Sequence, residues 1–204
     1  MATETVRFYF DPTCPWAWQS AQWMREVERV RDVRIEWGLF SLRLVNESID
    51  DPLTDESAKS VPALRALALA GRDGGQEAID RLYSAIGARI HDGDGTLDRA
   101  TLDASVADAS LPPDLVDRAM ADPTTAEDVR AQHCEAAAGV EAFGVPTIVL
   151  ESGRGIFGPV VAVAPTGEAA GELWDRVRWL AEFDGFFELK RERDRRPGDL
   201  AAAS

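Results

Sequence analysis

The sequence predicts an α/β fold in which a four-stranded mixed sheet carries a large α-helical insertion. Three observations support this prediction. Residues 5–10 and 33–40 alternate apolar and polar side chains, as strands do, with a helical pattern between them. Two further strand segments and a last helix follow residue 145. The long stretch between these groups contains helical patterns only, so the order is β-α-β, helical block, β-β-α.

The β-α-β unit occupies the first 40 residues. Val6, Phe8 and Phe10 alternate with more polar residues and predict the first strand. Pro15 suits the first turn of the helix that follows, and residues 33–40 predict the second strand. The unit spans roughly 36 residues, which is the length of one βαβ unit with a right-handed crossover.

The helical block contains five predicted helices, some of which are separated by prolines. They cover residues 63–70, 76–90, 97–109, 113–120 and 126–138. After the block, residues 146–151 and 156–158 predict a β-hairpin, and residues 167–183 predict the final helix.

This order divides the chain into three parts. We expect residues 1–45 and 140–190 to form one discontinuous domain around the sheet. Residues 46–139 form the helical insertion, and residues 191–204, which are charged and then rich in alanine, are predicted to be a flexible tail. No internal repeat points to a second independent domain.

The composition excludes several classes of protein. The chain has 204 residues and a formal net charge of −14, with 36 acidic and 22 basic residues, which disfavours nucleic acid as a partner. Two cysteines do not make a disulfide scaffold. No signal-peptide pattern and no apolar window long enough to span a bilayer is present, so we expect a cytoplasmic protein, monomeric or homodimeric, without membrane contact.

Cys14 is the first candidate for chemistry, because it lies where the first strand meets the first helix. Unpaired N–H groups and the positive end of the helix dipole favour a thiolate at that position. They lower the pKa of a cysteine from about 8.5 to between roughly 3.5 and 7 in redox motifs. We therefore expect a nucleophilic thiol, and the alternative is a small buried core residue.

The second candidate is the segment before the third strand, where Val145 and Pro146 follow Gly144. If the Val145–Pro146 bond is cis, the loop exposes the backbone of Val145, and an extended substrate can pair with it beside Cys14. The alternative is an ordinary trans proline that opens a strand.

Several segments together resemble the DsbA-like branch of the thioredoxin superfamily, and most closely the actinobacterial mycothiol-dependent reductases, or mycoredoxin-like nitroreductases. These segments are residues 8–16, 41–47, 88–91, 144–147, 157–160 and 186–191. The resemblance implies a thioredoxin-like fold with a helical lid, an attacking first cysteine and a cis proline facing it. It implies no tightly bound cofactor, a low-molecular-weight thiol (mycothiol or glutathione) as co-substrate, and a small electrophilic or disulfide substrate.

The same resemblance suggests roles for residues around Cys14. His91 ends a predicted helix of the insertion and, as an imidazolium, would stabilise the thiolate or bind the thiol. Its alternative is a helix-end histidine that interacts with the dipole and with Asp92. Trp16 would form an aromatic wall beside the sulfur, and Asn46 a polar contact. The other positions expected to bind substrate are Pro15, Ala17, Val145 and Pro146.

The sequence departs from the family at Ala17, because the usual motif is Cys-Pro-Trp-Cys and a methyl group cannot resolve a mixed disulfide. Four explanations are open. An external thiol resolves the adduct in a monothiol cycle, Ala17 is an engineered replacement that traps the adduct, Cys134 resolves it, or redox turnover is lost and thiol binding retained. Cys134 lies in a predicted helix, where we expect a core position.

Two other functions compete with the reductase. One is a kappa-class glutathione transferase or 2-hydroxychromene-2-carboxylate isomerase, which usually carries serine in place of Cys14. The other is a thiol-binding protein without turnover.

Residues 153–158 match a dinucleotide-binding pattern by letter, but no helix begins there, so we expect no dinucleotide site. No Cys and His spacing fits a zinc site, and we expect no metal.

Overall fold

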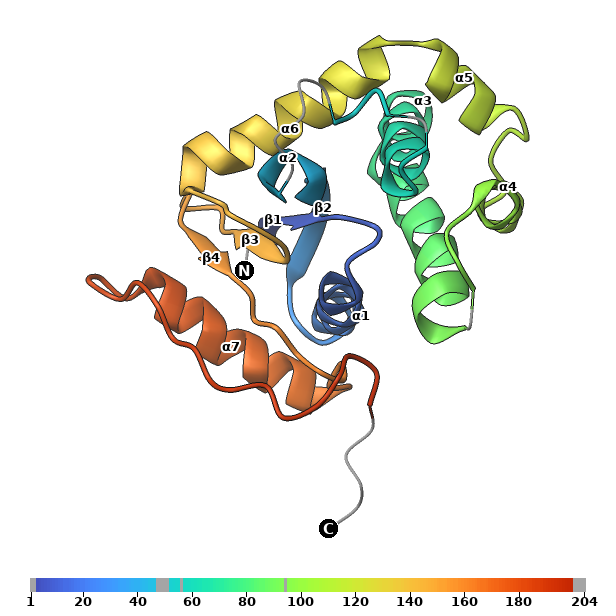
Figure 1. Cartoon of the computed structure of the whole chain (residues 1–204). Helices are drawn as coiled ribbons and strands as arrows, with labels where there is room; N and C mark the ends of the chain where they lie inside the picture. Colours follow the sequence, from blue (N-terminus) through green and yellow to red (C-terminus); the bar gives the residue numbers. More distant parts are fainter. Residues whose placement is uncertain (1–2, 47–51, 56, 94, 200–204) are drawn as a thin grey trace.

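The structure is a computed structural model that describes residues 3–46, 52–55, 57–93 and 95–199. Its centre is a four-stranded sheet in the order β2-β1-β3-β4 (Figure 1). The strands are Glu4–Phe10 (β1), Val33–Leu39 (β2), Thr147–Val149 (β3) and Gly155–Phe157 (β4). β1 is parallel to β2 and antiparallel to β3, and β3 is antiparallel to β4. The predicted α/β class and mixed sheet are confirmed.

Helices surround this sheet, and most of them match the predicted segments in order. They are Pro15–Val30 (α1), Leu42–Asn46 (α2), Ser60–Gly87 (α3), Arg99–Asp108 (α4), Leu115–Ala121 (α5), Thr124–Val140 (α6) and Glu168–Glu182 (α7), with a π-helical turn at Ala88–Asp92 (η1). α2 was not predicted, because five residues are too few to show a helical period. The predicted helices 63–70 and 76–90 form one element, α3, which is broken at Gly75, where φ is +67°.

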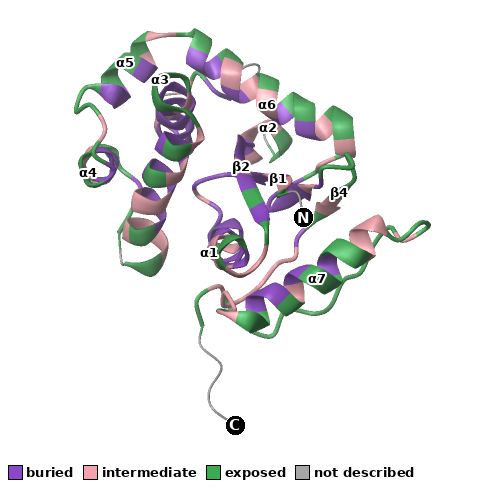
Figure 2. Cartoon of the chain, turned by 180° about the vertical axis from the view of Figure 1, so that it is seen from behind, coloured by how far each residue is buried: buried purple, intermediate pink, exposed green. Residues whose placement is uncertain are grey.

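One face of the sheet forms the core with α1 and α3. Phe10 of β1 stacks on Tyr83 of α3 with ring centroids 3.7 Å apart. Trp18 of α1 meets the same tyrosine edge-on at 5.5 Å. Figure 2 shows the buried residues concentrated along β1, α1 and α3. Trp18 and Trp23, both expected in the core, are 1% and 0% exposed. These rings join the helical insertion to the sheet.

The end of α3 lies directly against α1. A Cβ atom on Gly87 would stand 2.2 Å from the ring of Trp18, so only glycine permits this approach. The chain then continues into η1, and Trp18 donates a hydrogen bond from Nε1 to Asp92 at 2.8 Å. The contact therefore brings the end of α3 to the N-terminal half of α1.

α7 covers the outer side of α1. The rings of Trp23 and Trp174 lie 6.2 Å apart, and Trp23 donates from Nε1 to the carbonyl oxygen of Ala170 at 3.0 Å. After α7 the chain turns back and runs alongside that helix toward α1 (Figure 1).

Two expectations remain predictions: the flexibility of the tail, and the division of the chain into a sheet domain and an inserted lid. None of the helices in the described residues is long and apolar enough to cross a membrane.

Candidate active site

Cys14 is the N-cap residue of α1. Its backbone is extended (φ −85°, ψ 109°), and its sulfur accepts a hydrogen bond from the backbone N–H of Ala17, with 3.4 Å between N and Sγ. Pro15 follows in the first helical turn, where its missing N–H costs no hydrogen bond. The predicted position of Cys14 at the helix N-terminus is therefore confirmed.

The expected lowering of the Cys14 pKa is wrong for this arrangement. The residue is only 9% exposed, and burial raises the pKa of the thiol, because a thiolate loses solvation there. The backbone N–H groups of Ala17 and Trp16 act in the opposite direction but do not overcome burial. The helix N-terminus therefore reduces the rise in the Cys14 pKa but does not turn it into a lowering.

The Val145–Pro146 loop lies against the sulfur. The peptide bond is cis, which decides between the two alternatives that the sequence left open. The Cys14 thiol points to the carbonyl oxygen of Val145, with 3.9 Å between Sγ and O. Thr147 donates from Oγ1 to Gly144 at 2.8 Å and holds the loop in shape. Two segments far apart in the sequence therefore form one site.

Asp11, which sequence reasoning missed, fastens the loop that leads to Cys14. Its side chain is fully buried and accepts hydrogen bonds from both the backbone N–H and the hydroxyl of Thr13, at 2.9 and 2.6 Å. A third comes from the backbone N–H of Leu42, at 2.9 Å. Burial raises the pKa of Asp11, and these hydrogen bonds oppose that rise. The Asp-Pro-Thr sequence before the helix is an Asx-turn signal that was available beforehand.

His91 reaches the same loop from η1, with Nε2 2.9 Å from the carbonyl oxygen of Pro12. Because a carbonyl only accepts hydrogen bonds, Nε2 carries the proton. Burial lowers the pKa of His91, and the hydrogen bond to Pro12 and the nearby acids Asp92 and Asp11 oppose that change. The predicted imidazolium is therefore wrong near neutral pH. The neutral ring holds the loop in place.

Trp16 lies half-buried next to Cys14, and its ring faces an unexpected neighbour. The guanidinium carbon of Arg193 stands 4.8 Å from the centre of the indole.

Asn46 is exposed at the end of α2 and makes no hydrogen bond to the Cys14 loop within the described residues. Its contact with substrate stays a prediction.

Cys134 does not occupy the core position expected for it, since it is exposed on α6. The neighbouring His133 turns inward instead, with its ring 4.1 Å from that of Phe40. In the described residues, the hydrogen bonds of the Cys14 side chain involve Ala17 and Val145 and not α6. No arrangement of the two thiols for a disulfide is therefore seen.

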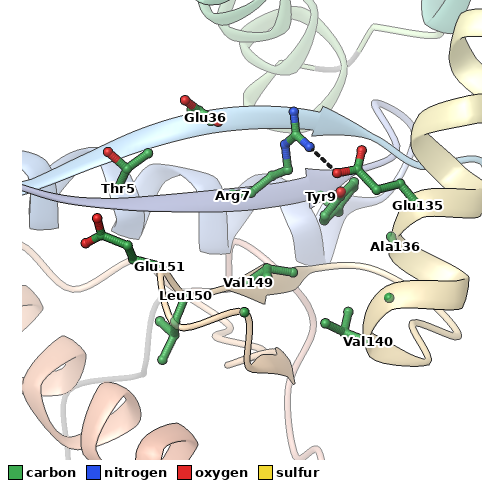
Figure 3. A pocket seen from close by; sticks show the side chains of 12 residues that line it. Thr5, Arg7, Tyr9, Glu36, Glu135, Ala136, Val140, Val149, Leu150 and Glu151 are labelled. Atoms are coloured by element: carbon green, nitrogen blue, oxygen red, sulfur yellow. Dashed lines mark hydrogen bonds and ion pairs between the residues drawn. The ribbon is translucent and has the colours of Figure 1, made fainter.

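Two cavities lined by described residues lie away from the sulfur. One, of about 420 Å³, opens on the sheet face that carries Arg7 and Tyr9, where Arg7 pairs with Glu135 at 2.6 Å (Figure 3). The other, of about 540 Å³, runs along α1 past Gln19 and reaches Asp92. Over the described ranges, no three His, Cys, Asp or Glu side chains are grouped to hold a metal ion.

Comparison with known proteins identifies relatives over most of the chain. Residues 13–191 match the family model described as Rv2466c-like, mycothiol-dependent nitroreductase Rv2466c. A Mycobacterium tuberculosis protein named "Uncharacterized protein Rv2286c" is 35% identical over 199 residues, which are 96% of this chain and 84% of that protein.

Solved structures share the fold at lower identity. A probable DsbA oxidoreductase, SCO1869 from Streptomyces coelicolor, has a TM-score of 0.62 and 21% identity, covering 94% of each chain. The cytosolic disulfide reductase DsbM from Pseudomonas aeruginosa, solved with GSH, has a TM-score of 0.57 and 18% identity, covering 85% of this chain and 99% of its own. A 2-hydroxychromene-2-carboxylate isomerase has a TM-score of 0.57 and 16% identity, covering 76% of this chain and 88% of its own. The fold is therefore the DsbA-like variant of thioredoxin.

Proposed function

The chain belongs to the Rv2466c-like family of mycothiol-dependent nitroreductases, and from that membership we propose that it reduces disulfide or electrophilic substrates through Cys14. The observation that carries the proposal is the Cys14 sulfur between the N-terminus of α1 and the cis Val145–Pro146 loop. A low-molecular-weight thiol, mycothiol or glutathione, supplies the electrons. The same proposal puts the enzyme in the cytoplasm, where such thiols are kept reduced.

The proposed cycle uses one protein thiol. The Cys14 thiolate attacks the low-molecular-weight sulfur of a mixed disulfide, the S–S bond breaks, and the substrate thiol leaves and takes up a proton. A second low-molecular-weight thiolate then attacks that same sulfur. The bond to Cys14 breaks, and the two small thiols depart as an oxidised disulfide. The substrate gains two electrons, and the two small thiols lose them.

Ala17 is the reason for a cycle with one thiol. Its side chain is buried at the position of the second cysteine in the family motif, and its backbone N lies 3.4 Å from Sγ. That N–H stabilises negative charge on the sulfur whenever the thiolate forms or leaves. Pro15 and Trp16 line the approach, and Asn46 is proposed to bind the substrate or the small thiol.

Mass spectrometry of the intact protein tests this proposal. Cys134→Ser protein and the double variant Cys14→Ser/Cys134→Ser are exposed to oxidised glutathione or oxidised mycothiol. We expect one adduct on the first protein, which an excess of the reduced thiol removes, and none on the second. No adduct on Cys134→Ser protein would remove Cys14 as the redox nucleophile.

One observation favours a binding protein without turnover as the second candidate. Cys14 is 9% exposed and burial raises its pKa, so the resting thiol is a weak nucleophile. This alternative predicts that an adduct forms and persists in excess reduced thiol. The transferase or isomerase alternative predicts instead that the thiol binds without a mixed disulfide.

A further inference from the structure

The chain after α7 supplies a cation to the Cys14 site. Arg193 is exposed, and its guanidinium carbon lies 4.8 Å from the centre of the Trp16 ring, a cation–π distance. Trp16 belongs to the motif that carries the nucleophile. The tail thus reaches the reactive end of α1 from a distant part of the sequence.

Hydrogen bonds hold this C-terminal segment, residues 191–199, near α1. The backbone N–H of Gly198 donates to the carbonyl oxygen of Ala162 at 2.7 Å. The loop that contains Ala162 is itself fixed to α1, because Ala164 N–H donates to Gln19 and Ser20 donates to the carbonyl oxygen of Pro159, at 3.2 and 2.7 Å. Figure 1 shows the segment returning alongside α7 to this place. The hydrogen bond at Gly198 and the contact of Arg193 with the Trp16 ring therefore place this segment beside α1.

Arg193 also differs from its neighbours in charge pairing. Arg195 forms an ion pair with Asp194 at 3.2 Å, whereas no carboxylate within the described ranges lies at ion-pair distance from Arg193. The chain as a whole carries a net charge of −14 and so repels anions. A guanidinium without a carboxylate partner is accordingly a local exception beside Cys14, and its charge favours the thiolate.

We propose that Arg193 is a specificity-determining residue, which makes the Cys14 site selective for oxidised substrates that carry a negative charge close to the reacting atom. A guanidinium binds a carboxylate through two parallel hydrogen bonds, and the exposed Arg193, for which no hydrogen bond to another described residue is seen, is available to do so. A substrate disulfide with a carboxylate a few bonds from sulfur fits this geometry. The inference rests on the proposed function only in taking Cys14 as the nucleophile.

Alkylation of Cys14 by two reagents of equal shape tests the proposal. Iodoacetamide is neutral and iodoacetate is anionic, and both react with the thiolate, so the ratio of their rate constants cancels the thiolate fraction. The rates are measured at low ionic strength in a Cys134→Ser background, where Cys14 is the remaining thiol. We expect Arg193→Gln to lower the iodoacetate-to-iodoacetamide ratio by about twofold to fivefold, the range for exposed charges.

Three controls separate this effect from a change in structure. Arg195→Gln removes the same charge two residues away and should leave the ratio unchanged. Arg193→Lys should keep part of the preference for iodoacetate, because charge is retained and the planar group is lost. Added salt should reduce the ratio of the parent protein and hardly change that of Arg193→Gln. Equal ratios in Arg193→Gln and Arg195→Gln would overturn the inference, and failure of Cys14 to alkylate at all would overturn the proposed function with it.

Discussion

The Cys14 sulfur lies 3.9 Å from the carbonyl oxygen of Val145, which follows 131 residues later in the chain. The first residue caps α1, and the second precedes the cis bond that leads into β3. Because β1 and β3 are neighbours in the sheet, the loops at their adjoining ends meet. We expect a substrate that extends along Val145 to present its sulfur to Cys14, because the sheet order brings these two loops together.

Replacing Ala17 with cysteine should restore a dithiol site. The position is buried and its backbone N is 3.4 Å from Sγ, so a new thiol there lies within reach of Cys14. We expect Ala17→Cys to form an internal disulfide on mild oxidation and to lose two hydrogens, measured by intact mass in a Cys134→Ser background. Ala17→Ser is the matched control. If Ala17→Cys keeps two free thiols after oxidation, the two positions do not face each other as the structure has them.

Cys14 should need a higher pH than an ordinary cysteine to react, because burial raises the pKa of its thiol. Burial raises the pKa of the thiol, so its alkylation by iodoacetamide should reach half-maximal rate at higher pH than that of an unfolded peptide containing the same cysteine. The exposed Cys134, measured in a Cys14→Ser background, provides a second reference. A midpoint for Cys14 below that of the peptide would show that the helix N-terminus outweighs burial.

Asp11 should be more important for stability than a partly exposed aspartate with similar hydrogen bonds. Asp11→Ala leaves the partly buried backbone N–H of Leu42 and the N–H of Thr13 without their partner, which should lower the free energy of unfolding by about 2 kcal/mol. Asp55, which accepts from Ser57 and also pairs with Arg43 at 2.9 Å, is the comparison position. Asp55→Ala should cost less than about 1 kcal/mol in urea unfolding. Equal losses would mean that Asp11 does not fasten the Cys14 loop.

His91 should titrate below the ordinary range for histidine. Burial lowers its pKa, so the imidazole is neutral at pH 7, and NMR of its ring protons should show a midpoint below that of a free peptide. For the same reason His91→Asn should leave the pH profile of Cys14 alkylation between pH 6 and 8 unchanged, within about twofold. A shift of that profile to higher pH would show that an imidazolium does support the thiolate.

Gly87 should resist substitution, because it lies under the ring of Trp18. A Cβ atom there would be 2.2 Å from the indole, so Gly87→Ala should destabilise the protein by roughly 1–3 kcal/mol. Gly139 in α6 has nothing within 4 Å of the same atom, and Gly139→Ala should be neutral or stabilising by up to about 1 kcal/mol. Thermal unfolding of both variants checks the contrast, and similar melting temperatures would contradict the close packing of α3 on α1.

Sequence patterns predicted the parts of the fold that depend on local periodicity. The alternation in residues 5–10 and 33–40 corresponds to β1 and β2, and Pro15 marks the start of α1 as expected. α2 escaped prediction because it is short, whereas the kink at Gly75 inside α3 lies between the two helices that the sequence predicts there, residues 63–70 and 76–90.

The site itself was predictable in outline only. Cys14 and the Val145–Pro146 loop were found from local sequence, because each has a local signature. The rise in the Cys14 pKa and the neutral state of His91 depend on desolvation by tertiary packing, which no local pattern reports. The stacking of Arg193 on Trp16 joins segments from the two ends of the chain and was equally out of reach.

Turnover of a mixed disulfide is the most direct test of the central claim. Cys134→Ser protein is supplied with a mixed disulfide between a reporter thiol and glutathione or mycothiol, and with an excess of the same reduced thiol. The account predicts that each protein molecule releases many reporter thiols and that Cys14→Ser/Cys134→Ser protein releases none above background. Release of a single equivalent, followed by a permanent adduct on Cys14, would contradict the reductase and leave a thiol-binding protein.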